Sequence, residues 1–277
     1  MQDDVQVFSA TTLNEVLSRL KNISNLSILA GTTLCKKQLR NVKIILPSSC
    51  IFVGKIYELR EINRSERFIE FGSSVTLNQI LSLGKARIPH FFYDALLSVA
   101  SHSIRNLATL GGNICSTNHK MTLYAPLLAM DAELELKNFS ETRHIVMTKF
   151  TGIPKGFLLT KIRIPTPDWQ TAEFFKIGSP FKKNETCASY TFLANVSRGI
   201  LDDVRIAFCG PIALRSRETE NAVISSRLPL SERDILLLTE KTAQLYDEEC
   251  EKSHKIIDPL LKQQFLNLLA QSLKALK

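Results

Sequence analysis

The sequence lacks clustered cysteines, and this excludes the metal centres that such clusters form. No two of its six cysteines have the CxxC spacing that is typical of zinc and iron–sulfur sites. A disulfide framework is not expected either, because such frameworks belong to secreted chains. We therefore predict free and largely unreactive thiols at Cys35, Cys50, Cys115, Cys187, Cys209 and Cys250.

The sequence also lacks a long apolar segment. Its most apolar stretch, LYAPLLAM at residues 123–130, is far shorter than the roughly 20 residues of a membrane-spanning helix. Residues 1–10, MQDDVQVFSA, are acidic and lack the basic start and apolar core of a secretory signal. We therefore expect a cytoplasmic protein that does not associate with membranes.

Several nucleotide-binding and hydrolase motifs are missing. The sequence contains no G-x-G-x-x-G, no G-x-x-x-x-G-K-[ST], no H-E-x-x-H and no G-x-S-x-G. Its five histidines have no metal-ligand spacing. These absences argue against a Rossmann domain, a P-loop, a zinc protease and a serine hydrolase.

The charge balance is basic but does not predict a nucleic-acid partner. The net charge is +8, and basic residues gather at 36–43 and 60–67. Aromatic residues are not interleaved with these basic residues, and acidic residues are spread through the chain. We favour a solvated face, or a surface for an acidic partner subunit, over nucleic-acid binding.

Helix-start signals occur at four places. Thr12 and Thr76 open capping boxes, Ser231 precedes an acid at the matching position, and Asp258 precedes a proline. Residues 90–103 place apolar side chains at helical spacing. Residues 123–130 predict a further short apolar helix.

Strand patterns are distributed among these helices. The predicted strands cover LSILAG, VKIIL, ERFIEFG, AELELK, HIVM, LLTKIRIP, TCASYTFLANV and ILDDVRIAFCG, and the last two are joined by a hairpin signal at 197–199. Helices and strands mix without regular βαβ alternation, so the predicted class is α+β. Two prolines in PTPDWQ, residues 165–170, indicate a domain boundary.

Two glycine-containing segments stand out in a chain with only 11 glycines, namely residues 30–34 (AGTTL) and residues 109–113 (TLGGN). Glycine lets a ligand approach the backbone, and successive N–H groups in such a loop can form a concave nest for phosphate oxygens. The segments could hold a pyrophosphate between them. Local evidence alone favours the alternative, namely that both segments are tight turns.

The stretch from Ile104 to Leu136 then carries a resemblance. Its pattern, IRNLATLGGNI followed by LLAMDAELEL, resembles the flavin-binding medium subunit of the molybdenum hydroxylases, the xanthine dehydrogenase and carbon monoxide dehydrogenase flavoprotein family. Further pieces in the same order extend the resemblance over nearly the whole chain: LAGTTL, YELREI, FIEFGSSVTLNQIL, LLTKIRIP, AEFFKIGSP and VRIAFCGPIALRSRETE.

The resemblance implies an architecture. It implies a two-subdomain FAD-binding domain of the PCMH (vanillyl-alcohol-oxidase-like) type over residues 1–167, with subdomains at about 1–55 and 56–167. A small α+β domain with a three-stranded antiparallel sheet would follow over residues 171–277.

The resemblance also implies a function. FAD would accept electrons from iron–sulfur clusters on a small partner subunit, after a substrate is oxidised at molybdopterin on a large partner subunit. The electrons would then pass to NAD or another acceptor. No residue of this chain is expected to be catalytic or to bind a metal.

The site residues are carried over by position. The resemblance implies FAD contacts at Ala30, Gly31, Thr32, Thr33, Leu34, Ala100, Thr109, Gly111, Gly112, Asn113, Ser116, Leu158 and Lys176. Among them, Lys176 matches a lysine near the isoalloxazine ring, where a cation would favour the anionic reduced flavin.

Some positions depart from the family pattern. Thr32 replaces a glycine, Leu34 replaces an acid, Thr122 replaces an aspartate, and Asn118-His119 replaces Ser-Pro. Each lost polar contact could cost about 1–3 kcal/mol of binding energy. An alternative is therefore a flavin-free structural subunit of the same complex. A stand-alone flavin oxidase is disfavoured, because no residues are arranged as a substrate acid or base.

Overall fold

The computed structural model describes residues 5–38, 43–116, 120–178, 187–256 and 258–277. Backbone contacts divide the chain into two compact units. The first unit contains Met1–Gly84, Ala100–Cys115 and Ala132–Pro165, and the second contains Lys85–Val99, Ser116–Asp131 and Thr166–Lys277. The second unit therefore combines two short segments from the N-terminal half of the chain with everything that follows Pro165.

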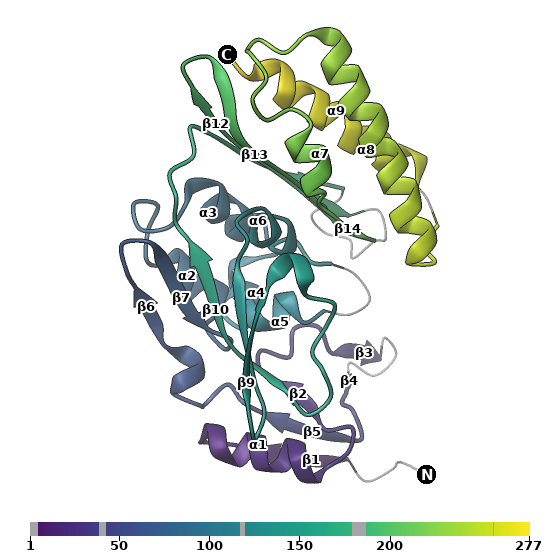
Figure 1. The fold of residues 1–277 in the computed structure, drawn as a ribbon. Helices are drawn as coiled ribbons and strands as arrows, with labels where there is room; N and C mark the ends of the chain where they lie inside the picture. Colours follow the sequence, from purple (N-terminus) through teal and green to yellow (C-terminus); the bar gives the residue numbers. More distant parts are fainter. Residues whose placement is uncertain (1–4, 39–42, 117–119, 179–186, 257) are drawn as a thin grey trace. The chain divides into compact units, whose positions relative to one another are not determined.

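The first unit opens with a small parallel sheet. Its strand order is β1 (Gln6–Ser9), β5 (Ser49–Phe52) and β2 (Ser27–Leu29), and α1 (Leu13–Asn22) joins β1 to β2 in the chain (Figure 1). As predicted, Thr12 caps α1, and its side chain accepts a hydrogen bond from the Glu15 N–H. Val16 of α1 and Ile51 of β5 are fully buried in the same core. β3 (Lys36–Gln38) and β4 (Lys43–Ile45) form a separate antiparallel pair.

A five-stranded antiparallel sheet forms the rest of this unit. Its order is β6 (Ile62–Arg64), β7 (Phe68–Gly72), β10 (Leu158–Pro165), β8 (Glu133–Lys137) and β9 (Thr142–Val146). Short helical elements accompany it: η1 (Glu58–Arg60), α2 (Leu77–Leu81), α4 (His102–Arg105), α5 (Leu110–Ile114) and η2 (Met147–Lys149). The capping box predicted at Thr76 is complete, with Gln79 as its partner.

Charged residues pair on one face of this sheet. Glu70 of β7 accepts hydrogen bonds from Lys161 at 2.9 Å and from Arg163 at 3.2 Å, both on β10. Partial burial acts to raise the pKa of Glu70, but the two cationic partners outweigh it and hold that pKa below its ordinary value. The alternate residues Ile162 and Ile164 are fully buried. This alternation explains why the strand was readable from sequence.

The helix predicted over residues 90–103 is in fact two helices. α3 (His90–Leu97) ends before residue 98, and α4 begins at His102. Between them Ala100 adopts a φ of +46°, which a continuing right-handed helix cannot accommodate. The apolar spacing continued through this break and so gave no sign of it.

The second unit is built on a four-stranded antiparallel sheet. Its order is β11 (Thr171–Ile177), β12 (Ala188–Ser197), β13 (Ile200–Cys209) and β14 (Ala213–Leu214). The sequence pattern predicted β12 and β13, and the resemblance implied a three-stranded antiparallel sheet; β14 adds a two-residue fourth strand at the edge. Arg198 and Gly199 turn the predicted hairpin with φ values of +53° and +73°, which is the geometry of a two-residue primed turn.

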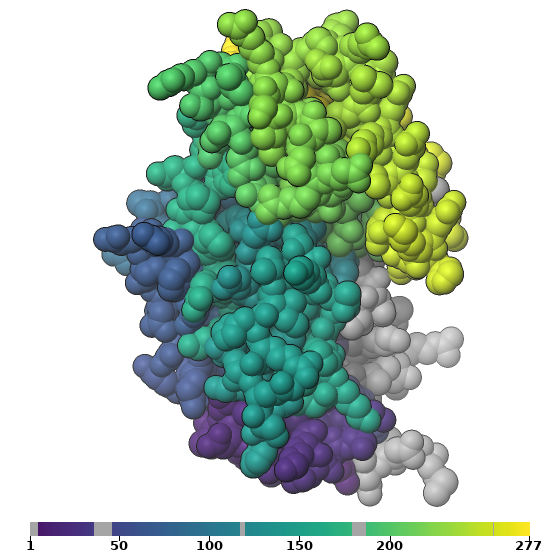
Figure 2. Space-filling model, viewed as in Figure 1, coloured from purple at the N-terminus to yellow at the C-terminus, as the bar shows by residue number. Residues whose placement is uncertain are grey.

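Helices cover both faces of this sheet. α8 (Glu232–Lys252) and α9 (Pro259–Ala275) lie side by side over one face, with α7 (Arg217–Asn221) beside them (Figure 1). Ser231 and Asp258 cap α8 and α9 as predicted. The yellow-green residues of these helices form an outer surface of the unit (Figure 2). α3 packs on β11, and α6 (Tyr124–Ala129) packs on β12 and β13.

Aromatic rings fill the core between the sheet and these two long helices. Tyr190 and Phe208 of the sheet contact Phe265 of α9, with ring centroids 5.8 Å and 4.6 Å apart. Tyr246 of α8 joins the same cluster, and each of the four rings is at most 1% exposed. Such rings each bury about 150–250 Å², so this cluster supplies much of the apolar burial of the unit.

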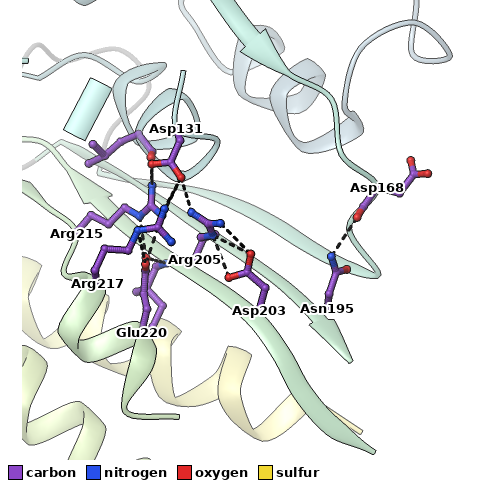
Figure 3. Close-up of polar contacts among 10 residues, drawn as sticks. Asp131, Asp168, Asn195, Asp203, Arg205, Arg215, Arg217 and Glu220 are labelled. Atoms are coloured by element: carbon purple, nitrogen blue, oxygen red, sulfur yellow. Dashed lines mark hydrogen bonds and ion pairs between the residues drawn. The ribbon is translucent and has the colours of Figure 1, made fainter. Parts of the chain in front are cut away.

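An ionic network at Asp131 ties the end of α6 to the sheet (Figure 3). Asp131 follows α6 and pairs with Arg215 at 2.7 Å and with Arg217 at 2.6 Å. Arg205 of β13 also pairs with Asp131. Arg215 donates a further hydrogen bond to the Leu128 carbonyl. Three cations thus converge on one carboxylate from segments far apart in the sequence.

Glu220 supplies a second carboxylate to this network, because it pairs with Arg215, which also pairs with Asp131. Its side chain is 0% exposed, and its carboxylate accepts a hydrogen bond from the Nε atom of Arg215 at 2.8 Å. The Arg215 side chain is itself only 1% exposed. Glu220 also accepts the Ile206 backbone N–H at 2.9 Å. A buried carboxylate and a buried guanidinium therefore neutralise one another, as burial of charge requires.

Two surveys of the described residues complete the fold. None of their helices combines the length and apolarity that a membrane crossing needs. In the same residues, no group of three or more histidine, cysteine, aspartate or glutamate side chains is placed to hold a metal ion. All six cysteines are free thiols.

Candidate functional site

The two glycine-containing segments lie against each other in the first unit. A Cβ atom added to Gly31 would lie 1.8 Å from the Leu107 carbonyl oxygen and 2.6 Å from its carbon. Gly31 is therefore packed directly on the backbone at residues 107–108, which immediately precedes Thr109. Any side chain at position 31 would separate the segments. The structure thus brings together the two regions that the sequence suggested could share a pyrophosphate.

The first segment follows β2 and leaves its backbone donors available. Among the described residues, no hydrogen-bond acceptor is found for the N–H groups of residues 31–34, while the Cys35 N–H closes the turn onto the Thr32 carbonyl at 3.1 Å. Ala30, Gly31, Thr32 and Thr33 are half-buried, and the Leu34 side chain is 42% exposed. Consecutive unpaired amides of this kind suit the oxygens of a phosphate.

The second segment is a helical turn rather than an open loop. Residues Leu110–Ile114 form α5, and Thr109 caps it by accepting the Gly112 N–H at 3.1 Å. The Gly111 N–H donates to the Ser73 carbonyl at 2.9 Å, and the Asn113 N–H donates to the Thr109 carbonyl at 3.0 Å. These amides are already bonded, so they do not form the predicted open nest. The groups left to contact a ligand are side chains and the exposed backbone at Gly112.

The adjacent residues Gly111 and Gly112 have different structural roles. A Cβ on Gly111 would lie 2.6 Å from the Ser73 carbonyl oxygen and 2.8 Å from the Ser73 Cβ, so Gly111 is required for packing inside the unit. Gly112 is exposed, and a Cβ there would meet only the Thr109 hydroxyl oxygen, at 3.0 Å. Gly111 thus allows the turn to pack against Ser73, and Gly112 leaves its backbone exposed at the surface.

Side chains that the sequence reading missed hold the segment before Thr109. Asn78 of α2 donates to the Asn106 side-chain oxygen at 2.6 Å and to the His102 carbonyl at 3.2 Å. Arg105 donates to the Ala100 carbonyl at 2.9 Å. These bonds fix the left-handed turn at Ala100, which is exposed. In the sequence, the pair Arg105-Asn106 was the one feature that could have indicated these hydrogen bonds.

The remaining predicted site residues are placed elsewhere. Leu158 is 2% exposed and packs with Val16 and Ile51 in the core of the first unit, so its side chain presents almost no surface to a ligand. Ser116 is half-buried and begins a segment of the second unit.

Lys176 also belongs to the second unit, where its ammonium donates to the Ser98 carbonyl at 2.7 Å. Burial lowers its pKa, although the Cys187 thiol nearby acts in the opposite direction. Of the departures from the family pattern, Thr122 is half-buried, and Asn118-His119 lies outside the described residues.

Thr32 is strained in a way that predicts the effect of a substitution. Its φ is +54°, a left-handed conformation that costs an L-residue about 1–2 kcal/mol. We expect Thr32→Gly to raise the free energy of unfolding by about 0.5–1 kcal/mol, because relief of strain exceeds the added chain entropy of glycine. Denaturant titration followed by circular dichroism measures this change.

The control for this prediction is Thr33→Gly. Thr33 is not among the residues with positive φ, so its substitution should destabilise the chain by about 0.5–1 kcal/mol. If Thr32→Gly destabilised the chain as much as Thr33→Gly does, the left-handed geometry at Thr32 would be contradicted.

Comparisons with known proteins bear on this geometry. A family model described as "FAD binding domain in molybdopterin dehydrogenase" matches residues 3–167. The glyceraldehyde dehydrogenase medium chain of Sulfolobus acidocaldarius is 24% identical over 229 residues, which are 79% of this chain and 80% of that protein. The nicotinate dehydrogenase FAD-subunit of Eubacterium barkeri is 27% identical over 189 residues, with 63% of each chain covered.

A solved structure agrees with these relatives in fold. Carbon monoxide dehydrogenase from Hydrogenophaga pseudoflava aligns with a TM-score of 0.79 at 18% identity, over 98% of this chain and 94% of that chain. Two longer curated relatives are covered over only 18% and 14% of their own lengths. The family model spans more than half of the sequence, and the chain therefore belongs to the family of FAD binding domains in molybdopterin dehydrogenases.

Proposed function

We propose that this chain is the FAD-binding electron-transfer subunit of a multi-subunit molybdenum hydroxylase in the cytoplasm. Its partners would be a molybdopterin-binding large subunit and an iron–sulfur small subunit. Bound FAD would supply the redox chemistry, accepting electrons that arrive from the iron–sulfur clusters and passing them to NAD or another acceptor. Two observations support this role: the family membership of residues 3–167 and the direct packing of two backbone segments on each other at Gly31.

The observation that carries the proposal is the direct packing of Gly31 on residues 107–108. It places the donors of residues 31–33 beside the capped turn at Thr109 and the exposed backbone of Gly112. We propose that the diphosphate of FAD lies against these groups, with the N–H groups of the first segment and the Thr109 hydroxyl as donors. The chain itself then needs no acid or base, because its task is to position the cofactor.

The other predicted contacts remain part of the proposal. Ala100 and Asn113 belong to the same unit as the two segments, and Ser116 and Lys176 belong to the second unit. Leu158 would contribute through the core beneath β2 rather than through exposed side-chain surface.

Gly112→Ala tests the placement of the diphosphate. In the free chain the new Cβ would meet only the Thr109 hydroxyl oxygen at 3.0 Å, and alanine is the better helix former by about 1 kcal/mol. Folding should therefore be unimpaired. If a phosphate approaches this backbone, the same Cβ should weaken FAD binding at least tenfold, a loss of about 1.4 kcal/mol.

The measurement is titration of the purified chain with FAD, followed by the visible absorption and fluorescence of the flavin. The matched control is Gly54→Ala, whose Cβ would come no closer than 4.0 Å to the Ala30 carbonyl oxygen. Equal FAD affinity in Gly112→Ala and the unmodified chain would contradict a diphosphate at this position.

A second candidate is a flavin-free structural subunit of the same kind of complex. Two observations favour it: the strained backbone at Thr32 and the exposed apolar side chain of Leu34, where the family pattern has glycine and an acid. A chain that co-purified with molybdenum and iron–sulfur partners, yet bound no FAD on titration, would support this candidate and refute the first.

A further inference from the structure

A small cavity lies inside the second unit, between its sheet and the helices that cover one face. Ile206 of β13, Leu214 of β14 and Phe265 of α9 line its apolar side, and Thr219 of α7 and Thr242 of α8 also line it. Its volume is about 10 Å³. A cavity of this size begins to hold one water molecule, provided that polar groups line it. The cavity is too small for any larger ligand.

The Thr219 hydroxyl group is buried without a hydrogen-bond partner among the described residues. Thr219 is 4% exposed, and its Oγ1 atom neither donates nor accepts a hydrogen bond there. An unpaired buried hydroxyl destabilises the folded state. Buried polar groups in native proteins are therefore normally satisfied by the protein or by bound water.

The position of Thr219 in its helix explains why it lacks an internal acceptor. A threonine inside a helix can bond the carbonyl four residues earlier, and Thr239 and Thr242 of α8 both do so. Thr219 is the third residue of α7, so Arg215, four positions earlier, precedes the helix. A molecule bound in the cavity would supply the partner that the helix does not.

Two further hydroxyl groups line the same cavity. Ser216, the N-cap of α7, accepts the Thr219 N–H at 3.2 Å, and its own proton has no acceptor in the described part of the chain. Thr242 donates to the Leu238 carbonyl at 2.7 Å, and its oxygen can still accept a hydrogen bond. Together with Thr219, these groups offer the two to four partners, roughly, that a buried water needs.

We propose that this cavity binds one internal water molecule, which hydrogen-bonds the Thr219 hydroxyl and links α7 to α8 through Thr242. On their exposed side the same two helices are joined by the ion pair of Glu218 and Lys241, at 2.7 Å. The water joins them on their buried side, where Arg215 also lines the cavity. The inference goes beyond the proposed function, because it concerns the stability of the second unit and involves no FAD.

The decisive experiment counts long-lived water molecules in the full-length chain by oxygen-17 relaxation dispersion, which detects water oxygens and not protein hydroxyl groups. Thr219→Val replaces the hydroxyl with a methyl group of similar size. We expect the count to fall by about one, because the water loses a partner and the methyl group takes its space. We also expect the Tm to fall by about 2–4 °C, as the loss of a satisfied hydrogen bond predicts.

Matched variants separate the hydroxyl group from its location. Thr219→Ser retains the hydroxyl and should retain the water count of the unmodified chain. Thr239→Val makes the same chemical change on α8, where the hydroxyl bonds the Ile235 carbonyl and does not line the cavity. The water count of Thr239→Val should therefore be unchanged.

Circular dichroism identifies any variant that fails to fold. If Thr219→Val fails, electron density in crystals of the unmodified chain decides the question. A water within about 3.2 Å of the Thr219 Oγ1 atom would support the inference, and density without such a water would overturn it.

Two results with a folded Thr219→Val variant would contradict the inference. One is an unchanged water count. The other is a higher Tm, because removal of a hydroxyl that has no partner stabilises the folded state. Neither result bears on FAD binding, which is titrated separately, so the proposed function stands or fails independently.

Discussion

Replacement of Glu220 by alanine is expected to lower the free energy of unfolding by about 3–5 kcal/mol, because it leaves a buried charge without its partner. Arg215 is 1% exposed and loses its 2.8 Å contact. The Ile206 N–H loses its acceptor as well. Asp131 cannot fully compensate, because it already pairs with two other arginines, Arg205 and Arg217.

Trp169 gives a local readout for this experiment. It is the single tryptophan of the chain, and the Arg205 guanidinium lies 5.8 Å from its ring centroid. Guanidinium titration followed by tryptophan fluorescence therefore reports on the network and on the second unit. A loss below about 1 kcal/mol would contradict the importance of the buried pair.

Glu218→Ala is the matched control for Glu220→Ala. Glu218 lies on the same helix and pairs with Lys241 at 2.7 Å, but its side chain is 79% exposed. Exposed pairs contribute about 0–1 kcal/mol, so this variant should remain close to the unmodified chain. The comparison isolates burial, since both substitutions remove one carboxylate that binds a cation.

Replacement of Gly31 by alanine is expected to reduce FAD affinity at least 100-fold, a loss of about 2.7 kcal/mol. The new Cβ would lie 1.8 Å from the Leu107 carbonyl oxygen, a distance that no backbone can accept. The two segments must separate, and the donors of residues 31–33 then move away from Thr109. The same movement should also destabilise the first unit.

Flavin titration and denaturant titration together check this prediction. Gly54→Ala again serves as the control, since its Cβ has 4.0 Å of clearance from the Ala30 carbonyl oxygen. Retention of FAD affinity within about threefold in Gly31→Ala, about 0.7 kcal/mol, would show that the diphosphate does not depend on contact between the segments. That result would remove the main support for the proposed site.

The features that sequence predicted well are local in origin. All four predicted helix starts, at Thr12, Thr76, Ser231 and Asp258, are occupied by capping residues. The hairpin at Arg198-Gly199 was also correct. Each feature depends on a few neighbouring residues. A capping side chain bonds a backbone N–H group at the helix start, and a residue that tolerates positive φ forms the hairpin turn. Such signals survive any tertiary arrangement.

The features that sequence did not predict depend on distant partners. The strands β1 and β5 are four residues each and exist because they pair in parallel with each other. The turn at Leu110–Ile114 contains two glycines, which disfavour a helix, yet the cap at Thr109 and the bond to Ser73 make it helical. The network at Asp131 joins residues more than 70 positions apart.

The candidate site shows the same division. The glycine pattern located the two segments, and the structure places them in contact. It could not indicate that Asn78 holds the 102–106 stretch in place, because that contact spans 24 or more positions between short elements. Leu158 was assigned by position alone, and only the packing of the first unit reveals its place in the core.

The capped turn at Thr109 has a consequence for how the cofactor is loaded. Its N–H groups are bonded to Ser73, Val75 and Thr109, so groups of the chain itself account for its shape. Flavin capture then requires no local coil-to-helix ordering there, and the entropic cost of binding falls mainly on residues 31–34. Loading can follow folding as a separate late step, rather than serving as the template on which this region folds.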